Sequence, residues 1–178
     1  MRYFSGFGFC NEAELFKAWI PDSETTVAGF SYGAQQAVTY ALQTSYRIDR
    51  LVLLSPAFFQ DKNAAFVRLQ LKHFKRDAAA YARAFYANVC YPADIDVAPY
   101  RCEMNAQDLE KLLTYRWQED TLRRIADRGT VVEVILGESD RIINAQAACD
   151  FFAPLVDATY VIKDAGHMLR SKEDSDDV

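Results

Sequence analysis

The sequence contains few of the residues that build metal sites, since its 178 residues include only four cysteines and two histidines. The cysteines stand far apart and form no Cys-x-x-Cys pair, which argues against a zinc site. We therefore expect free, partly buried thiols, with a bridge between the second and third cysteine as the open alternative. The cysteines are Cys10, Cys90, Cys102 and Cys149.

Positive charge and long apolar runs are scarce as well. The 20 Lys and Arg against 25 Asp and Glu give a net charge of -5, which argues against a nucleic-acid partner. No apolar run approaches the roughly 20 residues of a membrane span. Residues 1–10 lack the pattern of a secretory signal, so we expect a cytoplasmic protein without a membrane partner. A hydrophobic content of 51% predicts one globular domain with a sizeable core.

The sequence does contain a Gly-x-Ser-x-Gly motif at residues 29–33, between a short apolar segment and a segment from Ala34 to Tyr46 that favours a helix. This order is typical of a nucleophile elbow, a tight turn that holds its serine in a strained backbone conformation. Its glycines are needed because side chains there would collide across the bend. Ser31 is thus a candidate nucleophile, and the N–H of Tyr32 a candidate oxyanion donor. Ordinary strand-to-helix turns share this pattern. Whether it is a nucleophile elbow therefore depends on whether a histidine and an acid follow downstream in the right order.

Short apolar strands and helices alternate along the chain, which predicts an α/β fold with a mainly parallel sheet of about five strands. The predicted strands are 2–5, 25–28, 50–55, 131–136 and 159–162. The predicted helices are 12–19, 34–46, 63–76, 77–88, 106–117, 119–127 and 145–152, the first with a capping box formed by Asn11 and Glu14. No strand is predicted between the strands at 50–55 and 131–136. Residues 57–128 are therefore predicted to form a helical lid inserted in a core of residues 1–56 and 129–178.

Two later loops supply partners for Ser31. Asp140 follows the strand at 131–136 and His167 follows the strand at 159–162, so both are expected at the carboxyl edge of the sheet, where such sheets place their sites. The order serine, acid, histidine is the one expected for an α/β-hydrolase triad, with His167 as general base and Asp140 orienting it. Glu138 and Asp164 are the alternatives for the acid. The other histidine, His73, lies in a basic stretch and is predicted to be solvated.

The stretches 29–33, 137–140 and 165–167 resemble the three signature loops of the α/β-hydrolase superfamily. Ser5-Gly6-Phe7-Gly8 stands where that family carries His-Gly-x-Gly, which implies the N–H of Phe7 as second oxyanion donor. The family usually has a hairpin before this loop and a further strand and helix before the elbow. Only residues 9–28 separate the two motifs here, so we expect these elements to be absent.

Five parallel strands in chain order would place most helices on one face of the sheet, because crossovers are right-handed. We therefore expect the lid, the tail from Ser171 or a second subunit, in a possible homodimer, to cover the other face.

The short chain and its aromatic opening, Ser-Gly-Phe-Gly-Phe, resemble the short pimeloyl-acyl-carrier-protein methyl ester esterases of biotin synthesis. That resemblance implies a serine carboxylesterase that works through an acyl-enzyme on Ser31, without a cofactor, on a substrate carried by acyl-carrier protein. A general carboxylesterase or an acyl thioesterase is the alternative within the enzymes. An inactive hydrolase-like binding module is the alternative of another class.

The stretch 57–128 carries aromatic side chains at helical spacing, which suits either plain core or an acyl pocket. The candidates for the acyl pocket are Phe58, Phe59, Phe66 and Phe85. The same stretch is basic within an acidic protein, and local positive charge steers an acidic partner. The candidates for contact with the carrier protein are Arg68, Lys72, Lys75 and Arg76.

Overall fold

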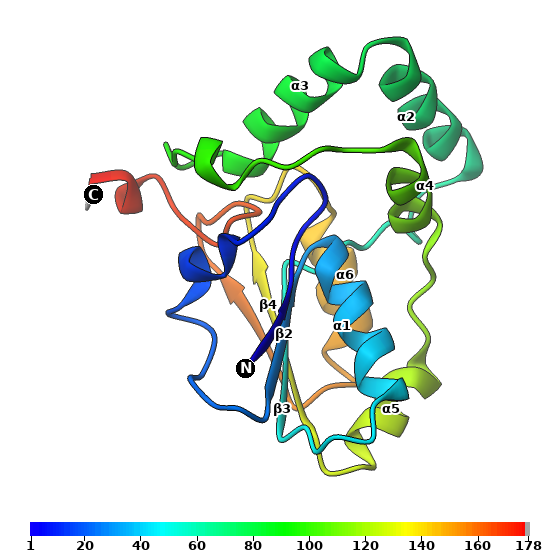
Figure 1. Ribbon diagram of the computed structural model, residues 1–178, viewed down its shortest axis with the longest axis vertical. Helices are drawn as coiled ribbons and strands as arrows, with labels where there is room; N and C mark the ends of the chain where they lie inside the picture. The colour runs from blue at the N-terminus through cyan, green and yellow to red at the C-terminus, as the bar shows by residue number, and fades with distance from the viewer. Residues whose placement is uncertain (177–178) are drawn as a thin grey trace.

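Five parallel strands form one sheet in the computed structural model of the protein, which describes residues 1–176 (Figure 1). The strands lie in chain order, so the predicted fold class, a minimal parallel α/β sheet, is confirmed. They are β1 (Arg2–Phe4), β2 (Thr26–Phe30), β3 (Arg50–Leu54), β4 (Val131–Gly137) and β5 (Ala158–Ile162).

Six α-helices and three short 3-10 helices accompany the sheet within the described residues. The α-helices are α1 (Tyr32–Gln43), α2 (Ala64–Arg76), α3 (Ala78–Cys90), α4 (Ala106–Thr114), α5 (Glu119–Ala126) and α6 (Ala145–Phe152). The 3-10 helices are η1 (Glu12–Phe16), η2 (Ala98–Tyr100) and η3 (Glu173–Asp176). Over residues 1–176, none of these helices combines the length and the apolar character that crossing a membrane requires.

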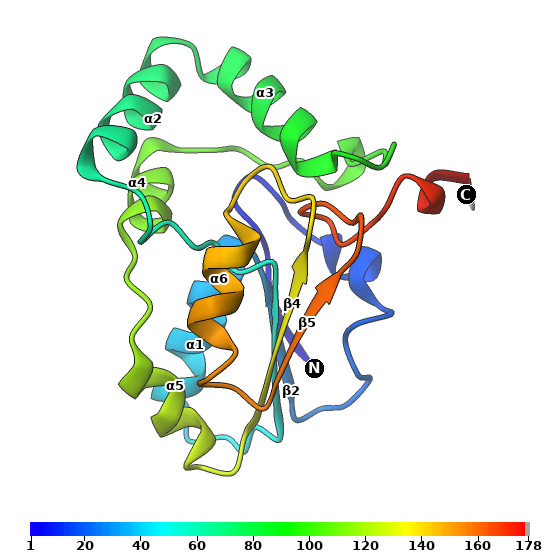
Figure 2. The ribbon, with the colours of Figure 1, turned by 180° about the vertical axis from the view of Figure 1, so that it is seen from behind.

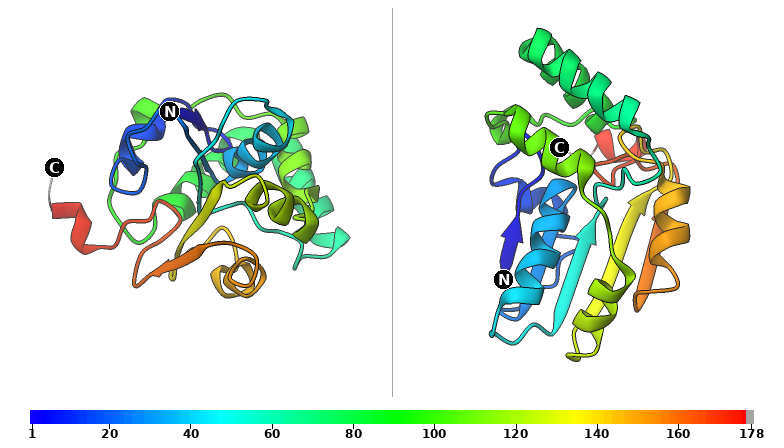
Figure 3. Two further views of the ribbon diagram at one scale, coloured as in Figure 1. Left: turned by 90° about the horizontal axis from the view of Figure 1, so that it is seen from below. Right: turned by 90° about the vertical axis from the view of Figure 1, so that its right-hand side faces the viewer.

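One face of the sheet is covered by α1, α5 and α6, as expected for right-handed crossovers between strands in chain order (Figure 3). Leu51, Val132 and Leu136 are fully buried in the core between the sheet and these helices. Within the stretch predicted as the lid, α5 contacts both α1 and β4. It therefore packs beside the sheet, because its buried Leu122 and Ile125 join this same core.

The opposite face is covered by loops. Phe30, Leu54 and Ile135 pack there against Phe16 of η1 and Met168 of the loop after β5, and all five side chains are buried. The loop between β1 and β2 and the residues after β5 lie over this face (Figure 2). The chain thus covers the carboxyl half of the face by itself, and a homodimer stays a prediction. Residues 177 and 178 of the tail lie outside the described residues.

Helices α2, α3 and α4 lie beyond the carboxyl ends of the strands (Figure 1). Each has an N-terminal side-chain cap: Asn63 accepts from the N–H of Phe66, Asp77 from that of Ala80, and Asn105 from that of Asp108. Helix α2 packs against α4. These helices cover the edge of the sheet at which the strands end. That they act as a lid stays a prediction.

The predicted capping box at Asn11 and Glu14 is wrong. Asn11 has a left-handed backbone with φ 61°, its side chain caps nothing, and the helix ends at Phe16. Asparagine tolerates this conformation better than most residues. Glu12 turns inward to accept from the N–H of Gly6, and Glu14 accepts from the hydroxyl of Tyr100. These long-range partners replace the local cap.

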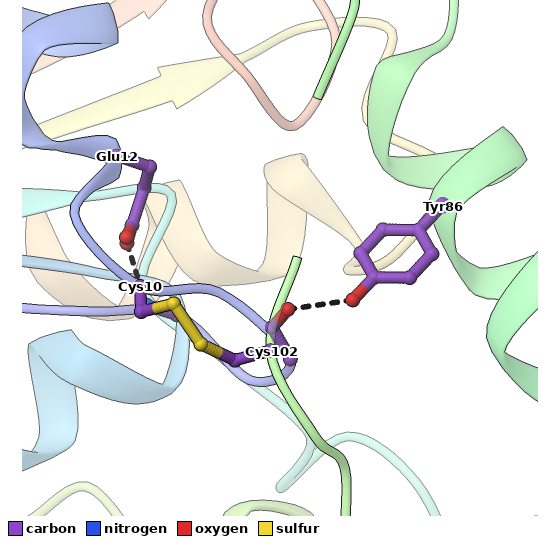
Figure 4. Close-up of a disulfide and its surroundings, with 6 residues drawn as sticks. Cys10, Glu12, Tyr86 and Cys102 are labelled. Carbon is purple, nitrogen blue, oxygen red and sulfur yellow. Dashed lines mark hydrogen bonds between the residues drawn. A yellow bond between two sulfur atoms is a disulfide. The ribbon is translucent and has the colours of Figure 1, made fainter. Parts of the chain in front are cut away.

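A disulfide joins Cys10 to Cys102, so the expectation of four free thiols is wrong for this pair (Figure 4). The N–H of Cys102 donates to the carbonyl of Gly8 (2.8 Å), and the N–H of Cys10 to the carbonyl of Tyr100 (2.9 Å). The bond therefore fastens the turn after β1 to the segment before α4. Its two cysteines are 92 residues apart in the sequence, and only the packed fold brings them together. Cys90 and Cys149 are free.

The turn from β2 into α1 brings backbone segments into contact with no room for side chains. Ser31 has φ 53° and ψ -111°, the strained conformation expected of an elbow. A Cβ on Gly29 would lie 2.3 Å from the carbonyl oxygen of Gly33, and one on Gly33 would lie 1.9 Å from that of Phe4. The predicted collision across the bend is confirmed for Gly29, whereas a side chain on Gly33 would collide with the end of β1. This second contact shows that the end of β1 rests directly on the elbow.

Replacing Cys102 with serine should lower the free energy of unfolding under oxidising conditions. The chain-entropy model assigns about 4–5 kcal/mol to a loop of this length, as an upper value. Urea unfolding of the oxidised proteins measures the difference, and Cys149→Ser, which removes a free thiol, is the matched control. Equal stability of Cys102→Ser and the wild type would contradict the prediction.

Replacing Gly33 with alanine should destabilise the fold by about 3 kcal/mol or more, because the new methyl group meets backbone that cannot move aside. The control is Gly129→Ala, where φ is +80° but nothing lies within 4 Å of the added carbon. That control isolates the backbone strain of a positive φ, about 1–2 kcal/mol. Thermal unfolding compares the two, and a smaller loss for Gly33→Ala than for the control would refute the contact.

Candidate active site

Ser31, His167 and Asp140 form a continuous hydrogen-bonded row at the carboxyl edge of the sheet. His167 Nε2 lies 3.0 Å from Ser31 Oγ, and Nδ1 lies 2.6 Å from Asp140 Oδ2. The histidine and aspartate side chains are 0% exposed, and Ser31 is buried. An ionised carboxylate only accepts, so it selects the tautomer with the proton on Nδ1. Nε2 is then free to accept from the Ser31 hydroxyl.

Asp140 is held by the backbone of its own loop. Its Oδ1 accepts from the N–H groups of Ile142 (2.6 Å) and Ile143 (3.1 Å), which leaves Oδ2 for the histidine. The alternative acids lie elsewhere: both Glu138 and Asp164 are exposed, and Glu138 accepts from the N–H of Asp164. Among these three carboxylates, Asp140 is the one bonded to His167.

The loop that carries His167 is fixed by a residue that the sequence reasoning missed. Ser55, at the end of β3, is completely buried with φ 40°, and its hydroxyl donates to the carbonyl of His167 at 2.7 Å. Phe30 packs beside the imidazole, with ring centres 5.1 Å apart. A Cβ on Gly166 would lie 1.6 Å from the carbonyl oxygen of Tyr91. The available signal for Ser55 was a hydroxyl at the end of an otherwise apolar strand.

Two backbone N–H groups near Ser31 suit an oxyanion. Tyr32 is the first residue of α1, where helical N–H groups lack partners within the helix. The other candidate, Phe7, sits in a turn in which the N–H of Phe9 donates to the carbonyl of Gly6 (3.0 Å). Gly8 has the φ of +73° that a type II turn needs at its third position.

The hydrogen bonds of this turn narrow the choice of the second donor among the N–H groups of Phe7, Gly8 and Phe9. The N–H of Phe9 is used inside the turn, which removes it as a donor to substrate. In the part of the chain that the structure describes, the N–H of Phe7 donates to no backbone carbonyl. Phe7 also lines the cavity that contains Ser31. It therefore stays the candidate, as a prediction.

A cavity of about 460 Å³ opens beside Ser31 between the sheet edge and helices α2, α3 and α4. Phe59, Phe66 and Phe85, three of the four candidates for an acyl pocket, line it, and their contact with an acyl chain stays a prediction. Phe58 does not line it, because it points into the core, where its ring packs against Phe151 and Phe152. The rest of the apolar wall comes mainly from α4 and the loop after β4, through Leu109, Leu112, Leu113, Ile142 and Ile143.

Part of the cavity lining is polar. The Tyr81 hydroxyl donates to Gln70 Oε1 (3.0 Å), and burial raises the pKa of Tyr81 to about 12, so the phenol stays protonated. His73 is exposed, as predicted, and it also borders the cavity together with Lys62 and Arg141. Across residues 1–176, no group of three or more His, Cys, Asp or Glu side chains is placed to hold a metal ion.

The predicted carrier contacts lie on the outer side of α2. Their positions in the helix repeat at intervals of three and four, which places them on one helix face. All of them are exposed, and within the described chain none forms an ion pair. These residues are Arg68, Lys72, Lys75 and Arg76.

Solved structures with the same fold include several hydrolases. MenH from S. aureus is 13% identical, with a TM-score of 0.63 over 93% of this chain and 85% of that one. Carboxylesterase CesB from Bacillus subtilis is 19% identical, with a TM-score of 0.52 over 81% of this chain. Bromoperoxidase from Bacillus anthracis is 16% identical, with a TM-score of 0.63 over 81% of this chain. The chain spans 53% of the CesB chain and 60% of the bromoperoxidase chain.

At such low sequence identities, these structural matches show a shared fold alone. No sequence among the curated proteins matches the chain. The family model described as "Alpha/beta hydrolase family" matches residues 11–178, which include the elbow and the loops of Asp140 and His167. By this match and by its sheet, the chain belongs to the alpha/beta hydrolase family.

Proposed function

We propose that the protein is a serine hydrolase that cleaves carboxylic esters through an acyl-enzyme on Ser31. The observation that carries the proposal is the hydrogen-bonded row from Ser31 through His167 to Asp140, with Ser31 lining a largely apolar cavity. Esterases among the structures of the same fold are consistent with this chemistry.

The geometry supports a two-step reaction. His167 Nε2 takes the proton of the Ser31 hydroxyl as Oγ attacks the ester carbonyl carbon. The negative oxygen of the tetrahedral intermediate accepts from the N–H groups of Tyr32 and Phe7, and Asp140 stabilises the imidazolium. His167 then protonates the departing alcohol. In the second step His167 deprotonates a water that attacks the acyl carbon, and it then returns the proton to Ser31 Oγ as the C–Oγ bond breaks and the acid leaves.

The substrate we favour is the methyl ester of a pimeloyl group on acyl-carrier protein. Its support is the resemblance of the chain opening, the aromatic wall formed by Phe59, Phe66 and Phe85, and the exposed basic face of α2. A general carboxylesterase or an acyl thioesterase would use the same row of residues. In an inactive binding module we would expect His167 to lie beyond hydrogen-bond reach of Ser31. Here His167 Nε2 lies 3.0 Å from Ser31 Oγ.

Ser31→Ala should abolish covalent labelling by a fluorophosphonate and reduce ester hydrolysis at least about 1000-fold. Intact-mass analysis should show one adduct on the wild type and none on the variant. Ser45→Ala, an exposed serine after α1, should label like the wild type. An adduct that persists on Ser31→Ala would refute Ser31 as the nucleophile.

Reversing the charges of Lys72, Lys75 and Arg76 to glutamate should lower kcat/KM for the carrier-bound methyl ester roughly tenfold at low salt, because steering of an acidic carrier is lost. Hydrolysis of a small free ester should not change, and the difference should shrink at high salt. Arg124→Glu on α5, exposed and distant from α2, is the control. Unchanged kcat/KM on the carrier-bound ester would exclude this face as the contact.

A further inference from the structure

A buried carboxylate lies beside the turn that carries Phe7. Glu12 is 0% exposed. Its Oε1 accepts from the N–H of Gly6 at 2.8 Å and from the hydroxyl of Tyr3 at 3.1 Å. Its Oε2 is buried with no hydrogen-bond partner, and within residues 1–176 the carboxylate forms no ion pair.

Burying such a group lowers the stability of the folded state. A buried polar oxygen without a partner costs free energy, and a buried carboxylate without a cation costs more. An apolar side chain at position 12 would fill the space without that penalty. Violations of this kind concentrate where a local geometry serves a function. The feature that Glu12 holds is therefore the place to look for its role.

That feature is the peptide unit presenting the N–H of Phe7. The carbonyl of Gly6 and the N–H of Phe7 belong to one planar peptide. The N–H of Phe9 donates to this carbonyl at 3.0 Å, which fixes one end of the unit. Glu12 binds the N–H of Gly6, on the other side of the same Cα. Together the two bonds restrict both dihedrals of Gly6, and with them the direction of the Phe7 N–H.

Separate contacts hold the far side of the turn. The carbonyl of Gly8 accepts from the Tyr86 hydroxyl (2.6 Å) and from the N–H of Cys102 (2.8 Å). Tyr3, in β1, ties the carboxylate to the sheet. Burial and the neighbouring carboxylate raise the pKa of the Tyr3 phenol, so it stays protonated and donates. Glu12 thus links the turn to the strand that precedes it.

We infer that Glu12 is a positioning residue that, through the N–H of Gly6, aims the N–H of Phe7 at the oxyanion formed during ester hydrolysis. The inference rests on the proposed function. Because a carboxylate oxygen is a stronger acceptor than an amide oxygen, Glu12→Gln keeps the bond in weakened form and adds a buried amide donor. Glu12→Ala removes the bond altogether.

The test compares kcat and KM for a small ester, p-nitrophenyl butyrate, among the wild type, Glu12→Gln, Glu12→Ala and Tyr3→Phe. Each kcat is expressed per serine labelled at completion by a fluorophosphonate, so inactive molecules do not count. Glu12→Ala should lower kcat about 100-fold, the loss expected for a misplaced oxyanion donor, with KM changed less than about threefold. Glu12→Gln should retain a higher kcat than Glu12→Ala, and the fall in kcat for Tyr3→Phe should be smaller than the fall for Glu12→Ala.

A trifluoromethyl ketone supplies a second readout, because its adduct with Ser31 carries an oxyanion. Its affinity should fall in parallel with kcat across the series. A residue that only stabilises the fold would lower the melting temperature and the labelled fraction, and leave kcat per labelled serine unchanged. Glu14→Gln, an exposed carboxylate on the same short helix, is the matched control.

The outcomes separate this inference from the function on which it rests. A wild type that forms no adduct would overturn the proposed function, and the inference with it. A wild type that forms the adduct, with folded Glu12→Ala within twofold of its kcat, would overturn the inference alone. If Glu12→Ala does not fold, Glu12→Gln and Tyr3→Phe decide: unchanged kcat and ketone affinity in both overturn it, and a parallel fall supports it.

Discussion

The geometry of the site depends on a close backbone contact between Gly33 and the end of β1. A Cβ on Gly33 would lie 1.9 Å from the Phe4 carbonyl oxygen, so only glycine permits the approach. Tyr32 directly precedes this contact on α1, and Phe7 follows Phe4 by three residues. This contact between main chains therefore limits how far apart the two candidate oxyanion donors lie, and side chains such as Glu12 and Tyr86 hold the turn of Phe7 in addition.

Site and core are built from the same loops. Five strands in chain order leave one face of the sheet without α-helices among the described residues. Met168, next to His167, and Phe16, in the helix of Glu12, are buried on that face against Phe30. The packing that shields the sheet thus also fixes the loop of the histidine and the turn of Phe7. A sheet this small positions its site through burial of the residues beside it.

Much of this arrangement could be predicted from the sequence, because its causes are local or follow from strand direction. Glycines at both ends of the Ser31 motif indicated the elbow, and parallel strands bring Asp140 and His167 to one edge wherever they occur in the chain. The residues that escaped prediction depend on distant packing. Cys10 meets Cys102 only after the intervening helices have folded back. Ser55 finds the His167 carbonyl only once β3 and the last loop adjoin.

The Cys10–Cys102 bond also changes how the chain is connected. It closes residues 10–102 into a covalent ring that contains Ser31, α2 and α3, whereas Asp140 and His167 lie on the linear part that follows. A single cut by a protease anywhere in residues 11–101 therefore opens the ring without releasing a fragment. The nicked chain remains one molecule, with its nucleophile and its histidine still joined through covalent bonds.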